Sequence, residues 1–131
     1  MAHIFVIEDD APIQRLLQLF LNDAGHKVTI TGQSPLEMIP TLAETSPDLI
    51  LLDLMFGNEP LGWKAAQKLK TTPQTQAIPI ILCSAANRNI ETLQASAPIK
   101  EIEILFKPFD LDALGSMVDR VLMKASTPAF Q

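Results

Sequence analysis

Carboxylate, hydroxyl and amino side chains follow four short apolar runs of this 131-residue chain. The acidic triplet at 8–10 follows the first run, Asp53 the second, Ser84 the third and Lys107 the fourth. Carboxylates are the hard oxygen ligands that Mg²⁺ prefers, and an aspartate can itself accept a phosphoryl group. Ser84 could donate a hydrogen bond to a phosphoryl oxygen, and Lys107 supplies a positive charge. These residue types predict phosphoryl transfer to a carboxylate, in which the protein contributes position and charge neutralisation.

Each of these residues also has a purely structural explanation when it is taken alone. The triplet could form a charged turn in which Asp10 caps a helix, a serine after a strand is often a turn residue, and most lysines are solvated. Asp53 is more informative, because it follows the apolar run Leu49–Leu52 and is itself followed by Leu54-Met55-Phe56. A charge in such surroundings needs a partner or a metal ion, which favours a functional role for Asp53.

Short apolar runs alternate with helical periodicities along the chain. The runs predict strands at Ile4–Ile7, Val28–Thr31, Leu49–Leu54, Ile78–Cys83 and Ile102–Phe106. The periodicities predict helices at 12–24, from a capping box at Ser34–Glu37 onward, at Trp63–Thr71, at Asn89–Ala95 and at Leu111–Leu122. Pro40 lies inside the second helical pattern, so we expect a kink or an early end there. The segment Gly57–Gly62 is expected to be a loop.

This alternation predicts an α/β fold with a parallel sheet that helices cover on both faces. Five strand–helix units in a chain of this length favour a flavodoxin-like, doubly wound five-stranded parallel sheet of strand order 2-1-3-4-5. In this topology ligands bind beyond the carboxyl ends of strands 1 and 3, where the strand order reverses. The polar residues that end the strands are therefore expected to meet in one crevice.

Composition excludes several classes of protein. With 47% hydrophobic and 19% charged residues the chain is expected to be globular, forming one domain over 1–125 and a tail over 126–131. A net charge of −5 disfavours direct nucleic-acid binding. No apolar run is long enough to span a membrane, and the N-terminus does not resemble a signal peptide. The single cysteine, Cys83, is expected to be a buried thiol, which fits a cytoplasmic location.

The chain resembles the receiver domain of two-component response regulators over about residues 3–124. The matching segments are Ile4–Asp10, Pro47–Met55, Ile80–Ala85 and Phe106–Asp110. The resemblance implies that Asp53 accepts a phosphoryl group from the phosphohistidine of a sensor histidine kinase or phosphotransfer protein. It implies a signalling switch that catalyses only its own phosphorylation and dephosphorylation, and no metabolic enzyme.

The resemblance also implies roles for the other residues of the site. Glu8, Asp9, Asp53 and the backbone carbonyl of Met55 would hold Mg²⁺. Ser84 would contact the phosphoryl group and shift inward. Lys107 would pair with the phosphoryl group, ahead of a cis peptide at Pro108.

The family's output surface comprises the fourth helix, the fifth strand and the fifth helix, which would engage a downstream protein or a second copy of the chain. The family's switch aromatic is replaced here by Ile104. Strand alternation places Phe106 on the same face, so we expect Ile104 and Phe106 to act together as the switch with Ser84, although a static core role for Phe106 is equally consistent. Gly57 stands where the family has a proline, and Gly62 follows Asp53 by nine residues instead of eight, which predicts a longer, more flexible loop.

Two other functions remain as alternatives. The first is a phosphorylation-independent docking or dimerisation module with the same fold, motivated by Ile104 and the altered loop. The second is a hydrolase with an aspartate nucleophile of the haloacid dehalogenase type. That chemistry needs a second acid two residues after the nucleophile, where this chain has Met55.

Overall fold

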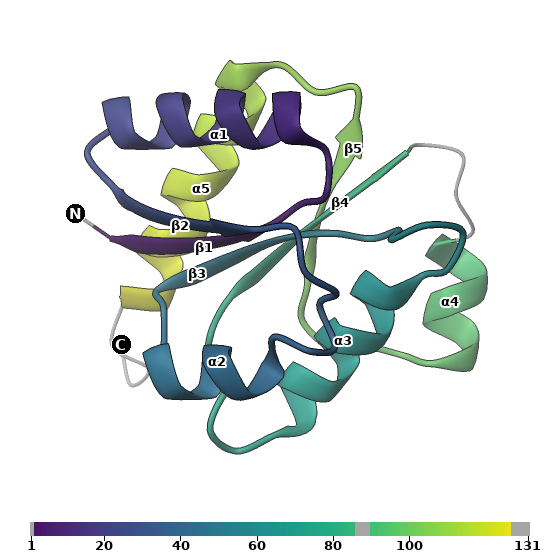
Figure 1. Cartoon of the computed structure of the whole chain (residues 1–131). Coiled ribbons are helices and arrows are strands. Elements are labelled where there is room, and N and C mark those ends of the chain that lie inside the picture. The colour runs from purple at the N-terminus through teal and green to yellow at the C-terminus, as the bar shows by residue number, and fades with distance from the viewer. Residues whose placement is uncertain (1, 86–89, 127–131) are drawn as a thin grey trace.

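The computed structural model describes residues 2–85 and 90–126. Five strands and five helices alternate along this part of the chain (Figure 1). In chain order they are β1 (His3–Ile7), α1 (Ala11–Asp23), β2 (Lys27–Thr31), α2 (Ile39–Thr45), β3 (Leu49–Asp53), α3 (Leu61–Thr71), β4 (Ile80–Ala85), α4 (Ile90–Ser96), β5 (Glu103–Lys107) and α5 (Leu111–Ser126).

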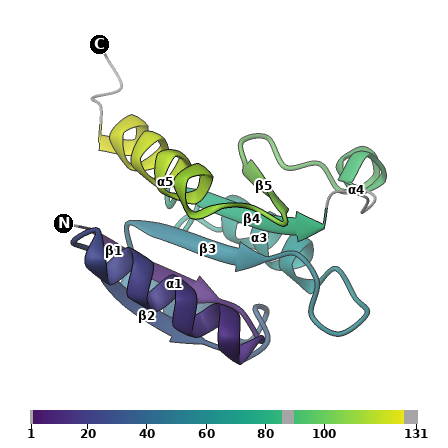
Figure 2. The same cartoon turned by 90° about the horizontal axis from the view of Figure 1, so that it is seen from above.

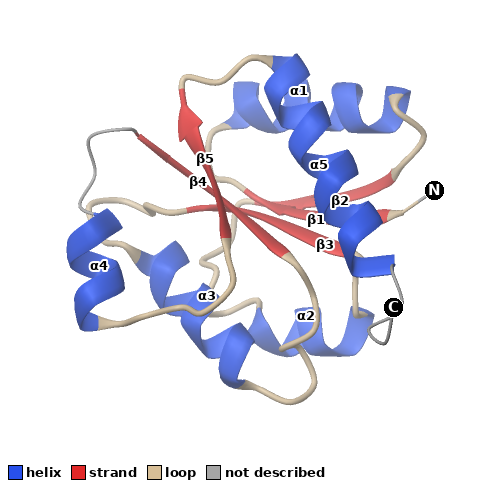
Figure 3. Cartoon of the chain, turned by 180° about the vertical axis from the view of Figure 1, so that it is seen from behind, coloured by secondary structure: helices blue, strands red, loops and turns tan. Residues whose placement is uncertain are grey.

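The strands form one parallel sheet in the order β2-β1-β3-β4-β5, which confirms the predicted flavodoxin-like topology. Helices α1 and α5 cover one face of the sheet, and α2 and α3 cover the other, with α4 next to α3 (Figures 1 and 3). Seen from above, α1 overlies β1 and β2 (Figure 2). The strand order reverses at β1 and β3, so the carboxyl ends of these two strands border the predicted crevice.

The central strands are apolar on both faces because each face is covered. Phe5 and Ile50 pack into the core on the α2–α3 side, whereas Ile4 and Leu51 pack into the core on the α1–α5 side. Alternate residues of one strand thus enter two different cores, and the sequence shows an unbroken apolar run. The same alternation on β5 sends Ile104 to the α2–α3 side and Leu105 to the α1–α5 side.

All five predicted strands have slightly different bounds in the structure, and the first two differ only by starting one residue earlier, at His3 and Lys27. The third ends at Asp53 instead of Leu54, and the fifth runs from Glu103 to Lys107. The fourth begins at Ile80 instead of Ile78, because Pro79 has no N–H to give to the ladder and contributes only its carbonyl, which accepts from the Ile50 N–H at 3.0 Å. As a result, Ser84 and Lys107 lie within strands.

The second helix begins at Ile39, so the predicted start at the Ser34 capping box is wrong. Residues 35–38 form turns instead, with the Met38 N–H bonded to the Pro35 carbonyl at 3.2 Å. A helix starting at Pro35 would place Pro40 in its interior, where the missing N–H and the ring are unfavourable. The structure places Pro40 in the first turn of α2, where no such conflict arises, so the expectation that Pro40 lies inside the helix is wrong.

The third helix begins at Leu61, so Gly62 is helical instead of closing the loop. The loop before it is tied by a turn in which the backbones of Phe56 and Glu59 bond at 3.0 and 3.3 Å. Gly57 has a φ of +64° in this turn, a value that proline cannot adopt. The added loop residue is thus accommodated by a defined turn, and the greater flexibility of this loop stays a prediction.

The last two helices agree with their predictions in position. Helix α4 covers Ile90–Ser96, and the predicted start at Asn89 lies outside the described residues. Helix α5 extends through Ser126, so the predicted start of the tail at residue 126 is wrong. Residues 127–131 lie outside the described part of the chain. Among the described helices, none combines the length and hydrophobicity needed to cross a membrane.

Candidate functional site

The carboxyl ends of four strands bring the sequence-predicted residues together. Asp53 is the last residue of β3, and Lys107 is the last residue of β5. Glu8 directly follows β1, and its N–H still bonds to the Thr31 carbonyl of β2 at 3.0 Å. Ser84 is the penultimate residue of β4. The prediction that these residues meet at one edge of the sheet is confirmed for the acids and Lys107 by the contacts described next.

Three carboxylates converge on one point. Glu8, Asp9 and Asp53 each offer an oxygen within 4.8 Å of the other two. Glu8 is only 4% exposed, Asp53 is half-buried and Asp9 is exposed, so the group opens to solvent on the Asp9 side. This is a donor set of hard oxygens with one open side, which suits a divalent cation that retains water ligands.

The buried carboxylates repel each other and are poorly solvated. Burial, reinforced by the charge of Asp53, raises the pKa of Glu8 to about 7, although Lys107 opposes this shift. Burial also raises the pKa of Asp53 above its ordinary value, and Lys107 again opposes the shift. The site therefore has more negative charge than its own cation can neutralise, which is the electrostatic condition that favours metal binding.

Lys107 connects the two buried acids. Its Nζ lies 3.2 Å from Oδ1 of Asp53, to which it donates a hydrogen bond, and 3.5 Å from Oε1 of Glu8. Burial lowers the pKa of Lys107, but the attraction of Asp53 and Glu8 outweighs this effect and raises the pKa overall. The peptide bond between Lys107 and Pro108 is cis, as the family resemblance implied.

Asp10, the third acid of the triplet, has the structural role considered for it. Its Oδ1 accepts a hydrogen bond from the Ile13 N–H at 3.1 Å and caps α1. Its own N–H donates to Oε2 of Glu8 at 3.2 Å, which fixes one carboxylate oxygen of the acidic group. Asp10 thus positions Glu8 while it starts the helix.

Ser84 is 1% exposed, and its hydroxyl donates to the carbonyl of Ala85 at 3.1 Å. In the β4–β5 register Ser84 lies opposite Phe106, and Ala85 lies opposite Lys107. Ser84 on β4 therefore lies one register position before Lys107, the last residue of β5. Its contact with a phosphoryl group stays a prediction.

Phe106 is not a core residue, because 46% of its surface is exposed at the end of β5. The alternative of a static core side chain for Phe106 is wrong. Ile104 is partly buried against the α2–α3-side core, to which Ile90 and Leu93 of α4 also belong. The joint switch role of Ile104 and Phe106 stays a prediction.

Met55 and Cys83 complete the predicted set. The Met55 side chain packs against the α2–α3-side core, and the metal-binding role of its carbonyl stays a prediction. Cys83 is buried opposite Asp53 in the β3–β4 register, as expected. Burial raises the pKa of its thiol to about 12, so the thiol stays protonated and unreactive at neutral pH.

Gln14 and Gly62 also belong to the site, although neither has a chemical signal in the sequence. The amide Nε2 of Gln14 donates to the backbone carbonyl of Glu8. The Gly62 N–H donates to the Leu54 carbonyl at 2.8 Å, and a Cβ on Gly62 would lie 2.0 Å from the Asp53 carbonyl oxygen. Only glycine permits this approach of α3 to the backbone of Asp53.

Comparison with known sequences identifies the family. A family model for the response regulator receiver domain matches residues 4–119. The transcriptional regulatory protein AfsQ1 of Streptomyces coelicolor is 36% identical over 93 residues, covering 71% of this chain and 39% of that protein. The DNA-binding transcriptional regulator NtrC of Azospirillum brasilense is 34% identical over 128 residues, covering 98% of this chain and 26% of that protein. The chain thus spans less than half of the length of either relative.

Solved structures share the fold. The signal receiver domain of a signal transduction histidine kinase from Syntrophus aciditrophicus has a TM-score of 0.83 at 23% identity, covering 98% of this chain and 96% of that chain. The receiver domain of a sensor histidine kinase from Pseudomonas aeruginosa, which has a magnesium ion coordinated in its active site cleft, has a TM-score of 0.78 at 20% identity, covering 93% of this chain and 98% of that chain. With the family match over residues 4–119, the chain belongs to the response regulator receiver domains.

Proposed function

We propose that this chain is a phosphorylation switch in which Asp53 accepts a phosphoryl group from a sensor histidine kinase or phosphotransfer protein. Response regulator receiver domains are signalling proteins and are largely non-enzymatic, so the chemistry is confined to the chain's own aspartate. The observation that carries the proposal is the acidic group, whose three carboxylates lie within 4.8 Å of one another beside Lys107.

The acidic residues fit a divalent cation on the grounds of ligand type and charge. Glu8, Asp9 and Asp53 would hold Mg²⁺, together with the Met55 carbonyl, and the exposed position of Asp9 leaves room for water and phosphate oxygens. When bound, the ion supplies positive charge that neutralises the carboxylates and the phosphoryl oxygens. A single-residue substitution of Asp53 would remove both a ligand and the acceptor.

The transfer forms one bond and breaks another. A carboxylate oxygen of Asp53 attacks the phosphorus atom, an O–P bond forms, and the N–P bond of the donor phosphohistidine breaks. The electron pair of that bond stays on the imidazole, which takes up a proton. The Nζ of Lys107 already donates a hydrogen bond to Oδ1 of Asp53 at 3.2 Å. Once the carboxylate has become an acyl phosphate, Lys107 would pair with the phosphoryl oxygens.

Ser84 would couple the phosphorylation of Asp53 to a change in packing elsewhere in the domain. Its hydroxyl now donates to the Ala85 carbonyl, a bond that a phosphoryl oxygen can replace. Inward movement of Ser84 would change the packing of Ile104 and of the exposed Phe106, its neighbour on β5. The surface of α4, β5 and α5 would then bind a downstream protein or a second copy of the chain.

The proposal is tested by incubating the protein with acetyl phosphate and Mg²⁺ and measuring its intact mass. We expect a single phosphoryl adduct on the parent protein and none on Asp53→Asn. Asp48→Asn is the matched control, because Asp48 is an exposed aspartate outside the acidic group, and its carboxylate accepts the His3 N–H. An unmodified parent protein would instead support the phosphorylation-independent docking module.

A further inference from the structure

A cavity of about 410 Å³ opens at the amino-terminal end of the sheet, at the opposite end from the acidic site. Pro79 and Ile80 line it at the start of β4, and Glu103 lines it at the start of β5. Since β4 continues from Ile80 to Ala85, the cavity lies roughly 16 Å from the strand ends that carry the acidic site. The proposed phosphoryl transfer makes no use of it.

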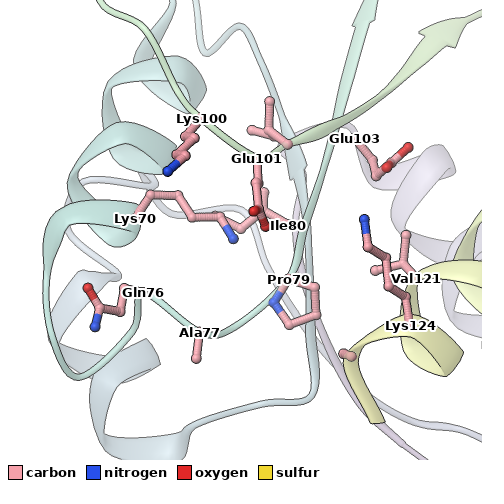
Figure 4. A pocket seen from close by; sticks show the side chains of 12 residues that line it. Lys70, Gln76, Ala77, Pro79, Ile80, Lys100, Glu101, Glu103, Val121 and Lys124 are labelled. Carbon is pink, nitrogen blue, oxygen red and sulfur yellow. The ribbon is translucent and has the colours of Figure 1, made fainter. Parts of the chain in front are cut away.

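Three lysines from three different segments line this cavity. Lys70 belongs to the last turn of α3, Lys100 to the segment between α4 and β5, and Lys124 to the end of α5. Figure 4 shows Lys70 and Lys100 on one side of Pro79 and Lys124 on the other. None of the three forms an ion pair with any residue that the structure describes. Three unpaired cations around one cavity reverse the local charge of a protein whose net charge is −5.

The acids of the cavity leave this positive charge in excess. Glu103 is paired with Arg120, whose Nη2 lies 2.8 Å from its Oε1, so its charge is already neutralised. Glu101 is the remaining carboxylate in the lining, and its charge attracts Lys70. A ligand that brings at least two negative charges would complete the balance.

Lys70 is the most constrained of the three lysines. Its side chain is half-buried, and its Nζ donates to the Ile78 carbonyl at 3.2 Å. Burial lowers the pKa of Lys70, and the attraction of Glu101 does not offset this effect. The ammonium group is therefore held in position at a half-buried point of the cavity wall, from which it could donate to an anion.

Part of the lining between the lysines is apolar. Pro79, Ile80, Ile102 and Val121 contribute hydrocarbon surface to the cavity. A cavity of this volume, lined by both hydrocarbon surface and charged side chains, suits a small organic anion better than a hydrated inorganic ion. We propose that this cavity binds a small organic anion with two or more negative charges, a phosphate ester or a polycarboxylate, through Lys70, Lys100 and Lys124.

The test is a titration of ¹⁵N-labelled protein with adenosine monophosphate and, in parallel, with citrate, followed by NMR. We expect saturable shifts of the backbone amides of Ala77, Ile102 and Ala125 at millimolar concentrations of one probe, with weaker binding at higher ionic strength. The probe that binds separates the phosphate ester from the polycarboxylate. Absence of saturable shifts with both probes would overturn the proposal.

Single substitutions of the lysines test whether they bind the anion. Lys70→Gln and Lys124→Gln should each weaken binding by about tenfold, the usual effect of losing one charged hydrogen bond. Lys64→Gln and Lys68→Gln are matched controls, because both lysines are exposed on α3 and neither lines the cavity. Equal affinities for all four variants would overturn the proposal. Asp53→Asn should bind as the parent does, so this result is independent of the phosphorylation proposal.

Discussion

Substitution of Gly62 by alanine tests whether the start of α3 holds Asp53 in position. The added Cβ would lie 2.0 Å from the Asp53 carbonyl oxygen and 2.8 Å from Cα and the carbonyl oxygen of Leu54. All three atoms belong to the backbone, so no side-chain rotation relieves the contact. Reaching an ordinary contact of about 3.5 Å requires a shift of roughly 1.5 Å between α3 and the end of β3.

We expect this shift to cost about 3 kcal/mol or more of unfolding free energy, at the upper end of overpacking effects. For a domain of this size that corresponds to a fall in melting temperature of roughly 10 °C. The shift also stretches the 2.8 Å bond from Gly62 N–H to the Leu54 carbonyl and displaces the carbonyl of Asp53. Folded Gly62→Ala protein should therefore accept phosphate from acetyl phosphate much more slowly than the parent protein.

Gly115→Ala is the matched control. Its Cβ would meet only the ring edge of Phe20, at 3.2 Å, and that side chain can give way. Because alanine also favours the helix by about 1 kcal/mol over glycine, the net effect should be neutral or slightly stabilising. Urea denaturation of both variants gives the comparison. If Gly62→Ala unfolds at the same urea concentration as Gly115→Ala and accepts phosphate normally, the close approach of α3 to Asp53 does not constrain the site.

Four further predictions concern the charges and the switch. Glu8 has a pKa of about 7 in the folded protein and 4.5 in the unfolded protein, so the folded state binds its proton more tightly. The free energy of unfolding of the metal-free protein should therefore fall as pH rises from 4.5 through 7, by about 3 kcal/mol at most. Mg²⁺ should therefore stabilise the protein more above pH 7 than below pH 4.5. Glu8→Gln should reduce this dependence of stability on pH. Urea denaturation with Mg²⁺ and with a chelator, at each pH, measures both effects. Lys107→Gln should destabilise the metal-free protein by about 1–2 kcal/mol, since it leaves two carboxylates unpaired at a partly exposed site, and Mg²⁺ should restore most of the loss. Trp63→Phe should cost about 1 kcal/mol, because it removes the 2.8 Å hydrogen bond from the indole to the Ala97 carbonyl after α4; an unchanged urea midpoint would show that this bond contributes nothing. Finally, if Ile104 and Phe106 form the switch, Ile104→Val or Phe106→Leu should weaken phosphorylation-dependent self-association or partner binding while both variants still accept phosphate, and parental responses from both would place the signal elsewhere.

The fold and the main site residues could be predicted because each lies next to a strong local signal. Apolar runs mark the buried strands, and the polar residue that ends each run must emerge at the carboxyl edge of a parallel sheet. Asp53 and Lys107 are thus 54 positions apart in the chain but adjacent in space, for a reason that topology alone supplies. Several of the errors concern residues whose backbone state depends on a proline or a glycine, such as Pro40, which lies in the first turn of α2 instead of in a helix interior.

Residues that meet through the packing of helices could not be predicted in this way. Gln14 reaches the Glu8 carbonyl, and Gly62 reaches Asp53, only because α1 and α3 have a particular rotation and height above the sheet. The same holds for Lys70 and Lys124, which come to one cavity from α3 and α5. Helix rotation is set by many small side-chain contacts on both faces of the sheet, and no short stretch of sequence encodes it. The residues that meet at the amino-terminal edge of the sheet can therefore be identified only from the structure, whereas those at the carboxyl edge can be predicted from the sequence.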